Sequence, residues 1–222
     1  MGFRDRTEAG QLLAAKLGKY ADTPNMLVLG LPRGGVPVAY EVAKALHAPL
    51  DVFLVRKLGL PGNEELAMGA IASGGVRVVN DEIKRVLQVP DEVIDQVSAE
   101  EEEELERRQL AYRGSRPPIK VRGRTVILVD DGLATGSTMR AAVEALRRQR
   151  PARVVVAVPV GAAETCAELE RAADEVVCAR TPEPFYAVGV WYDDFSQTSD
   201  AEVRELLEQA TEKQATPAAP ER

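Results

Sequence analysis

The 222-residue sequence contains one histidine and two cysteines, and these small numbers argue against several kinds of site. Cys166 and Cys178 show no CxxC spacing, so we expect neither a zinc site nor a disulfide and interpret both as small buried hydrophobic residues. His47 has no second histidine with which to share a metal ion. Nothing around it suggests a Ser-His-Asp mechanism.

The sequence also lacks an excess of basic residues, because its formal net charge is −7. Nucleic-acid and membrane-surface binding both need a clustered basic face, so we expect neither kind of partner. No apolar run reaches the ~18 residues needed to cross a bilayer. Met1–Asp22 is charged and amphipathic, unlike a signal peptide, and we therefore expect a cytoplasmic protein.

Two nucleotide-binding motifs are missing as well. No GxxxxGK[ST] sequence is present, which argues against a P-loop nucleotide hydrolase. The glycine-containing stretch Leu31–Gly35 lacks the GxGxxG pattern of dinucleotide-binding proteins.

The apolar pattern predicts an α/β protein, and 45% hydrophobic with 28% charged residues is typical of a globular domain. A strand, a loop, a helix and a second strand follow one another early in the chain, an order that favours a parallel sheet flanked by helices. We expect strands over 26–30, 50–55, 125–129, 152–158, 175–179 and 187–192. Helices are expected over 5–20, 36–46, 138–149 and 163–172.

The organisation expected from these elements is an α/β core of residues 1–80 and 119–210. Residues 67–72 and 76–79 are expected as strands or a hairpin inside that core. Two helices over 81–113 belong to an insertion, 81–118, that could serve as a hood or flap. Ser199 and Glu202 form a capping box that opens a C-terminal helix. The last residues, 211–222, are rich in Ala, Pro and charge, and we expect them to be disordered.

The most informative segment runs from Val126 to Thr138. An apolar strand delivers Asp130 and Asp131 to its carboxyl end, the edge at which open α/β sheets bind ligands. Thr, Gly, Ser and Thr follow and lead into a helix, whose N-terminus offers free N–H groups and a positive dipole end to a phosphate. Two carboxylates suit the hydroxyl groups of a ribose. The segment therefore predicts a phosphorylated ribose as ligand.

This segment resembles the motif with which type I phosphoribosyltransferases bind 5-phosphoribosyl-1-pyrophosphate (PRPP). The resemblance implies the fold of that family, a parallel sheet flanked by helices with a hood. Family members that act on 6-oxopurines carry Asp where this chain has Ala134, so such a substrate is not implied. Gly132 replaces a branched apolar residue of the motif, and we expect it to make the loop more flexible.

Other parts of the family layout follow in order. The stretch 31–35 resembles the pyrophosphate loop of the family, and we expect a cis peptide bond within Leu31–Gly34. Arg56 and Lys57 resemble a pair that reaches pyrophosphate from the end of the second core strand. The stretch Leu58–Glu65 is placed like the mobile catalytic loop that excludes water from the transition state.

Aromatic residues gather near the C-terminus, between Phe185 and Phe195. By the register of purine-salvage members, Tyr186 would stack on a base and Asp193 would lie near the metal and pyrophosphate. The resemblance thus implies Mg²⁺ as cofactor, bound mainly through ligand oxygens and water. It assigns catalysis to Asp130, Asp131 and Arg56, and substrate contacts to Arg33, Gly34, Gly35, Lys57, Ala134, Thr135, Gly136, Ser137, Thr138 and Tyr186.

The activity implied is transfer of the phosphoribosyl group of PRPP to a nitrogenous small-molecule acceptor, with release of pyrophosphate. Adenine, a pyrimidine, an amine or another base all stay open as acceptors. A regulatory protein that binds PRPP or a nucleotide without catalysis is the alternative. Many family members are dimers, and a homodimer is left open here.

Overall fold

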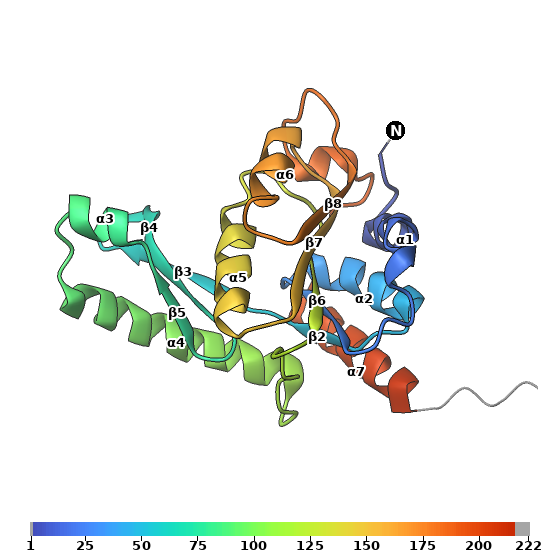
Figure 1. Cartoon of the computed structure of the whole chain (residues 1–222), viewed down its shortest axis with the longest axis horizontal. Helices are drawn as coiled ribbons and strands as arrows, with labels where there is room; N and C mark the ends of the chain where they lie inside the picture. Colours follow the sequence, from blue (N-terminus) through green and yellow to red (C-terminus); the bar gives the residue numbers. More distant parts are fainter. Residues whose placement is uncertain (1, 216–222) are drawn as a thin grey trace, which may run out of the picture.

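The computed structural model describes residues 2–215 and contains two sheets (Figure 1). Five parallel strands stand in the order β2-β1-β6-β7-β8, which confirms the predicted fold class. These strands are β1 Met26–Gly30, β2 Leu50–Val52, β6 Thr125–Val129, β7 Arg153–Val160 and β8 Glu175–Arg180. The second sheet is antiparallel, in the order β3-β4-β5, with β3 Val55–Leu60, β4 Asn63–Ala72 and β5 Val76–Val79.

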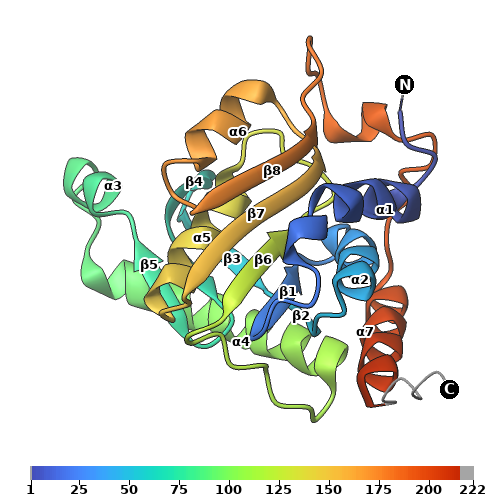
Figure 2. The same ribbon diagram turned by 45° about the vertical axis from the view of Figure 1, so that its right-hand side comes forward.

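Helices cover both faces of the parallel sheet (Figure 2). Successive strand residues alternate between the two faces, so Ile127 and Leu128 belong to different buried clusters. Because both faces are buried, the strands are almost continuously apolar, as the sequence pattern indicated. One face carries α1 Arg6–Lys16, α2 Gly35–Leu46 and α7 Asp200–Ala215, and the other carries α5 Ser137–Arg148 and α6 Ala163–Leu169.

The chain after β2 departs from the sequence prediction. The strand expected over 50–55 ends at Val52, and a new strand, β3, begins at Val55. The stretch Leu58–Glu65, expected as a mobile loop, instead belongs to the β3–β4 hairpin. Leu58 and Met68 are fully buried there, which gives this hairpin an apolar face of its own. The predicted hairpin over 67–79 is confirmed as part of β4 and β5.

The two helices expected over 81–113 are confirmed as α3 Asp81–Val86 and α4 Asp91–Arg113. Together with β3, β4 and β5 they form a projecting unit, which we call the arm (Figure 1). Its buried residues Leu58, Ile94 and Leu105 belong to the same apolar cluster as Ile127 of the parallel sheet. The arm is therefore packed onto the core rather than tethered to it by a linker.

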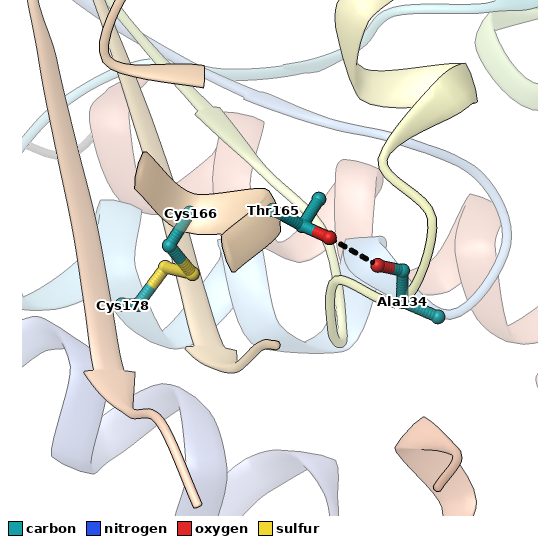
Figure 3. The surroundings of a disulfide bond; sticks show 4 residues. All are labelled: Ala134, Thr165, Cys166 and Cys178. Atoms are coloured by element: carbon teal, nitrogen blue, oxygen red, sulfur yellow. Dashed lines mark hydrogen bonds between the residues drawn. A yellow bond between two sulfur atoms is a disulfide. The ribbon is translucent and has the colours of Figure 1, made fainter. Parts of the chain in front are cut away.

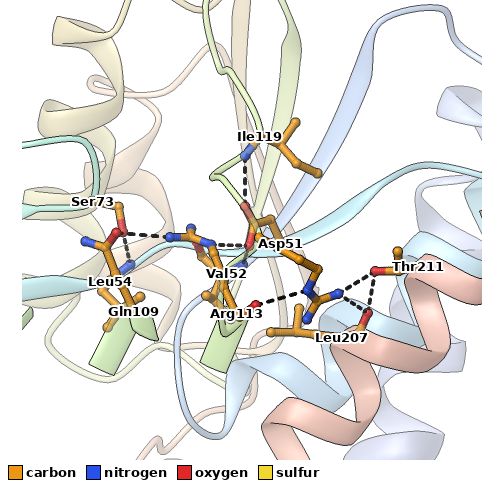
Figure 4. A network of polar contacts seen from close by, with 10 residues as sticks. Asp51, Val52, Leu54, Ser73, Gln109, Arg113, Ile119, Leu207 and Thr211 are labelled. Carbon is orange, nitrogen blue, oxygen red and sulfur yellow. Dashed lines mark hydrogen bonds and ion pairs between the residues drawn. The ribbon is translucent and has the colours of Figure 1, made fainter. Parts of the chain in front are cut away.

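A buried ion pair also fastens the arm to the core (Figure 4). Arg113, at the end of α4, donates from Nε to Asp51 of β2 at 2.7 Å and from a terminal nitrogen to the Val52 carbonyl at 2.7 Å. Asp51 accepts a further hydrogen bond from the backbone N–H of Ile119. Both charged side chains are less than a tenth exposed, so the pair depends on these additional bonds.

Three further expectations concern the C-terminal part. The strand expected over 187–192 is wrong: this stretch contains a 3-10 helix, Val188–Trp191, and a single bridge from Tyr192 to Phe3, so it has no strand ladder to join. The N-terminal cap of α7 is confirmed, because Ser199 Oγ accepts from the Glu202 N–H. The helix continues through residues 211–215, which contradicts disorder there, and 216–222 lie outside the described residues.

The remaining element is a 3-10 helix, Gly18–Tyr20, that follows α1. Within residues 2–215, none of the helices combines the length and apolar character needed to span a bilayer.

Candidate phosphoribosyl-binding site

Asp130 and Asp131, called the acidic pair below, lie at the carboxyl end of the central strand β6, against the loop that follows β1. A Cβ atom on Gly34 would lie 2.0 Å from Asp131 Oδ2, and one on Gly35 would lie 3.0 Å from Asp130 Oδ1. Gly34 therefore leaves room for the Asp131 carboxylate, and Gly35 leaves room mainly for the backbone of Val129 and Asp130. The two loops that the sequence analysis singled out thus meet at one edge of the sheet, although 95 or more residues separate them in the chain.

The peptide bond between Pro32 and Arg33 is cis, which confirms the expectation for Leu31–Gly34. The guanidinium of Arg33 lies 3.7 Å from Asp200 Oδ1 at the start of α7. The side chain is about one-third exposed and is therefore still accessible to solvent.

A cavity of about 160 Å³ opens above the loop that leads into α5. Gly136 begins the helix in the left-handed conformation, with φ of 68°, so a glycine is favoured there. The positive end of the helix dipole faces this loop. Lys57 reaches it from β3 and donates to Ser137 Oγ at 2.8 Å. The residues that line the cavity are Asp130, Gly132, Leu133, Ala134, Thr135, Gly136, Ser137, Thr138, Met139 and Val188.

Gly132 has a packing role that the sequence did not indicate. A Cβ atom at this position would lie 2.3 Å from Val188 Cγ1, so the glycine makes room for the C-terminal segment. That Gly132 also makes the loop more flexible stays a prediction. Val188 closes one wall of the cavity.

The loop is also supported from α6 (Figure 3). Thr165 donates its hydroxyl to the carbonyl of Ala134 at 2.7 Å. The next residue, Cys166, forms a disulfide with Cys178 of β8, which corrects the prediction of two unpaired buried thiols. Spacing along the sequence misled us, because a disulfide requires only that the Cα atoms come within reach, and here they are 6.6 Å apart.

The acidic pair has partners that the sequence did not indicate. Arg6, at the start of α1, binds Asp131 Oδ2 through Nε at 2.9 Å. Tyr192 donates its hydroxyl to the Asp131 carbonyl at 2.5 Å. Burial raises the pKa of Asp131 above its usual range, and the Arg6 charge opposes that rise. No sequence pattern links residues so far apart, so only the fold could reveal this contact.

Burial raises the pKa of Asp130 further, and the neighbouring carboxylate of Asp131 adds to the effect. Asp130 Oδ1 accepts the backbone N–H of Asp131 at 2.9 Å, which partly offsets the rise. Burial likewise raises the pKa of Tyr192, so this phenol remains a hydrogen-bond donor at neutral pH.

Three of the residues assigned from the family resemblance lie apart from this cluster. Arg56 binds Glu101 of α4 at 2.5 Å, because neighbouring residues of a strand point to opposite faces and Lys57 takes the face toward α5. Tyr186 is 79% exposed. Asp193 is exposed, and within residues 2–215 its carboxylate has no hydrogen-bond or ion-pair partner.

A metal ion would find few protein ligands here. Within residues 2–215, no group of three or more His, Cys, Asp or Glu side chains is arranged to hold one. An exposed carboxylate such as Asp193 fits a hard cation, but only as one ligand among several oxygens of substrate and water. The side chains present therefore fit Mg²⁺ that arrives with a diphosphate.

An acidic pair, a glycine-rich loop and a helix N-terminus lie together at the carboxyl edge of a parallel sheet, the edge at which open α/β sheets bind ligands and at which a helix N-terminus favours an anion. The model of the phosphoribosyl transferase domain family matches residues 6–193 of this chain. The chain belongs to that family.

Two proteins of Mycobacterium tuberculosis strains, each named a putative phosphoribosyl transferase, are 48% identical to this chain over 208 residues. The match covers 94% of this chain and 47% of each relative, so the chain spans about half the length of these curated relatives. The Bifunctional protein PyrR of a Roseiflexus species is 40% identical over 131 residues, which cover 54% of this chain and 62% of that protein.

A crystal structure of TT1426 from Thermus thermophilus has the same fold, with a TM-score of 0.85 and 44% identity. The match covers 94% of this chain and 99% of that chain. The arm is therefore included in the similarity, since residues 55–113 make up far more than the uncovered share.

Proposed function

We propose that the protein is a phosphoribosyltransferase that moves the 5-phosphoribosyl group of PRPP to a nitrogenous acceptor and releases pyrophosphate. The observation that carries this proposal is that the acidic pair lies against Gly34 and Gly35, beside the cavity above the loop Ala134–Thr138. A ribose bound between them would have its 5-phosphate at one end and its diphosphate at the other.

Each part of the site has a role in this proposal. The loop Ala134–Thr138 would bind the 5-phosphate through backbone N–H groups, hydroxyls and the dipole of α5. Lys57 already lies on that loop and would add a positive charge to the phosphate. Asp130, which lines the cavity, would accept a hydrogen bond from a ribose hydroxyl.

The loop of Pro32, Arg33, Gly34 and Gly35 would bind the leaving pyrophosphate. Glycines without Cβ atoms let backbone N–H groups approach an anion closely. Mg²⁺, when bound, would neutralise charge that develops on the diphosphate. The chain itself would position the reacting atoms and exclude water, which competes with the acceptor for the anomeric carbon. No protein nucleophile is required.

The acceptor stays open in this proposal. Ala134 has no carboxylate to contact a 6-oxopurine, and the exposed ring of Tyr186 does not discriminate between bases. Adenine, a pyrimidine, an amine or another base therefore remain to be screened. Magnesium dependence and a homodimer are likewise proposals carried by the family resemblance, and a cytoplasmic location is a proposal carried by the sequence pattern alone.

A second candidate function is a regulator that binds PRPP or a nucleotide without catalysis. The observation that favours it is the pairing of Arg56 with Glu101, which takes from the site a residue assigned to catalysis. Similarity to a protein named bifunctional is compatible with either role. Release of pyrophosphate in the presence of an acceptor separates the two candidates.

The first test is calorimetric titration with PRPP and Mg²⁺, with ribose 5-phosphate and ATP as comparison ligands. Saturable binding of PRPP is expected, and it should be abolished when Asp130 and Asp131 are both replaced by Asn. The matched control replaces Asp91 and Asp95, carboxylates on α4 that are exposed to solvent. Unchanged PRPP binding by a folded Asp130→Asn/Asp131→Asn protein would overturn the proposed site.

A further inference from the structure

Arg6 stands at a position where a helix gains nothing from a positive charge. It is the first residue of α1, and the N-terminus of a helix carries the positive end of the dipole. Asp5 caps the helix by accepting the Glu8 N–H, so Arg6 is not needed for that purpose. The helix itself gives no reason for an arginine at this position, so the reason must lie in the contacts that Arg6 makes outside α1.

The Arg6 guanidinium is almost fully used by contacts outside α1. Nε and a terminal nitrogen each lie 2.9 Å from Asp131 Oδ2, and the other terminal nitrogen donates to the Ser196 carbonyl at 2.7 Å. The Phe195 ring covers the guanidinium at 4.1 Å. The Arg6 and Asp131 side chains are only 12% and 15% exposed, so water screens the attraction between their charges poorly.

This ion pair lies directly against the loop of Pro32–Gly35. A Cβ atom on Gly34 would meet Asp131 Oδ2 at 2.0 Å and Arg6 Nε at 3.2 Å. The pair thus occupies the space beside Gly34, next to the cis peptide bond at Pro32. Asp131 Oδ2 is taken by Arg6, whereas Asp131 Oδ1 accepts no hydrogen bond from another residue within residues 2–215.

We infer that Arg6 is a positioning residue that holds the Asp131 carboxylate and, through it, the Pro32–Gly35 loop in the arrangement that binds the diphosphate end of PRPP. The inference rests on the proposed function. Arg6 fixes one oxygen of Asp131 and leaves the other free for a sugar hydroxyl or a loop N–H. Arginine suits this task because its planar fork binds the carboxylate and the Ser196 carbonyl at once.

The test compares Arg6→Gln, Arg6→Lys and a control, Arg4→Gln, by calorimetry with PRPP and with ribose 5-phosphate. Arg4 is two residues away on the same segment and is 71% exposed. We expect Arg6→Gln to weaken PRPP binding at least tenfold and ribose 5-phosphate binding far less, because ribose 5-phosphate has no diphosphate. Arg6→Lys should recover part of the loss, and Arg4→Gln should match the wild type.

A double-mutant cycle shows whether Arg6 acts through Asp131. In an Asp131→Asn background, the substitution Arg6→Gln should have little further effect on PRPP binding. Additive losses, or equal losses for PRPP and ribose 5-phosphate, would overturn the inference. Retained ribose 5-phosphate binding also shows that the variant is folded. If the wild-type protein binds no PRPP, the proposed function fails, whereas normal PRPP binding by Arg6→Gln overturns this inference alone.

Discussion

The carboxyl group of Asp130 illustrates how strongly a single side chain depends on its surroundings. It follows the buried strand residues Val126–Val129 and lies beside Asp131 and close to Gly35. Burial and the neighbouring carboxylate raise its pKa, which means that the fold disfavours its charged form. A residue that costs stability at its position is typical of a binding site.

Replacing Asp130 with the neutral isostere Asn should therefore stabilise the folded protein at neutral pH. The folded state binds the Asp130 proton more tightly than the unfolded state. The wild-type protein therefore loses stability as pH rises from the pKa of Asp130 in the unfolded state to its pKa in the folded state. The gain from Asp130→Asn should be complete above the folded pKa and should vanish as pH falls below ~4. Each kcal/mol gained would raise the midpoint of thermal unfolding by about 2–4 °C.

Thermal unfolding followed by circular dichroism at several pH values checks this expectation. Asp95→Asn is the matched control, since Asp95 is exposed on α4 and pairs with Arg77 at the surface. A melting temperature of Asp130→Asn below that of the wild type at pH 7 would contradict the expected cost of the buried charge.

Arg56 is assigned to catalysis by the family resemblance but is paired with Glu101 in the structure. The family resemblance predicts that Arg56→Ala lowers turnover more than ribose 5-phosphate binding, by on the order of 100-fold if a transition-state contact is lost. Glu101→Gln separates this role from a structural one. We expect Glu101→Gln to keep turnover, since the pair is partly exposed and contributes little stability. Equal losses in both variants would identify the ion pair itself as the functional unit.

At the scale of elements, α6 and β8 are joined by the disulfide between Cys166 and Cys178, which are 12 residues apart. Thr165, next to the disulfide, supports the Ala134 carbonyl of the phosphate loop. A Cβ atom on Gly136 would lie only 2.6 Å from the methyl group of Thr165. The position of α6 therefore bears directly on the shape of the loop.

Removing the disulfide by Cys166→Ser with Cys178→Ser should lower the free energy of unfolding by about 3 kcal/mol, the chain-entropy value for a loop of this length. Denaturant unfolding measures the loss. The wild-type protein in a reducing buffer is the natural comparison, and the double variant should show no response to reductant. A free-thiol titration that finds two reactive thiols in the unfolded, non-reduced wild type would contradict the pairing.

At the scale of the whole molecule, buried contacts join the arm to the core. Arg113 and Asp51 are both buried, and their bonds join the end of α4 to the edge strand β2. This contact fixes one end of the arm, and Lys57 on Ser137 fixes β3 against the phosphate loop. The two contacts lie at different ends of the arm, and the second brings Lys57 to the loop that leads into α5.

Replacing Arg113 with Met should destabilise the protein by about 3–5 kcal/mol, because Asp51 is left as an unpaired buried charge. Adding Asp51→Asn to Arg113→Met should recover part of that loss. Denaturant midpoints of the three proteins measure both effects. If the double variant is no more stable than Arg113→Met, the cost arises from lost packing rather than from the unpaired carboxylate.

The sequence by itself determined the parallel sheet and the candidate phosphate loop. Strands β1 and β6 begin and end where the apolar runs do, because both faces of a central strand are buried. The loop Asp130–Thr138 is a local feature, in which chemistry and spacing are contained in a few consecutive residues. The glycines of Leu31–Gly35 and the cap at Ser199 were predictable for the same reason.

Only the tertiary structure decided which distant groups complete the site. Arg6 meets Asp131, Val188 fills the space beside Gly132, and Cys166 reaches Cys178 through contacts that no local pattern encodes. Arg56 turned to α4 because its strand belongs to the arm rather than to the core sheet. Local sequence sets what each segment can form, whereas burial against other segments sets where its side chains point.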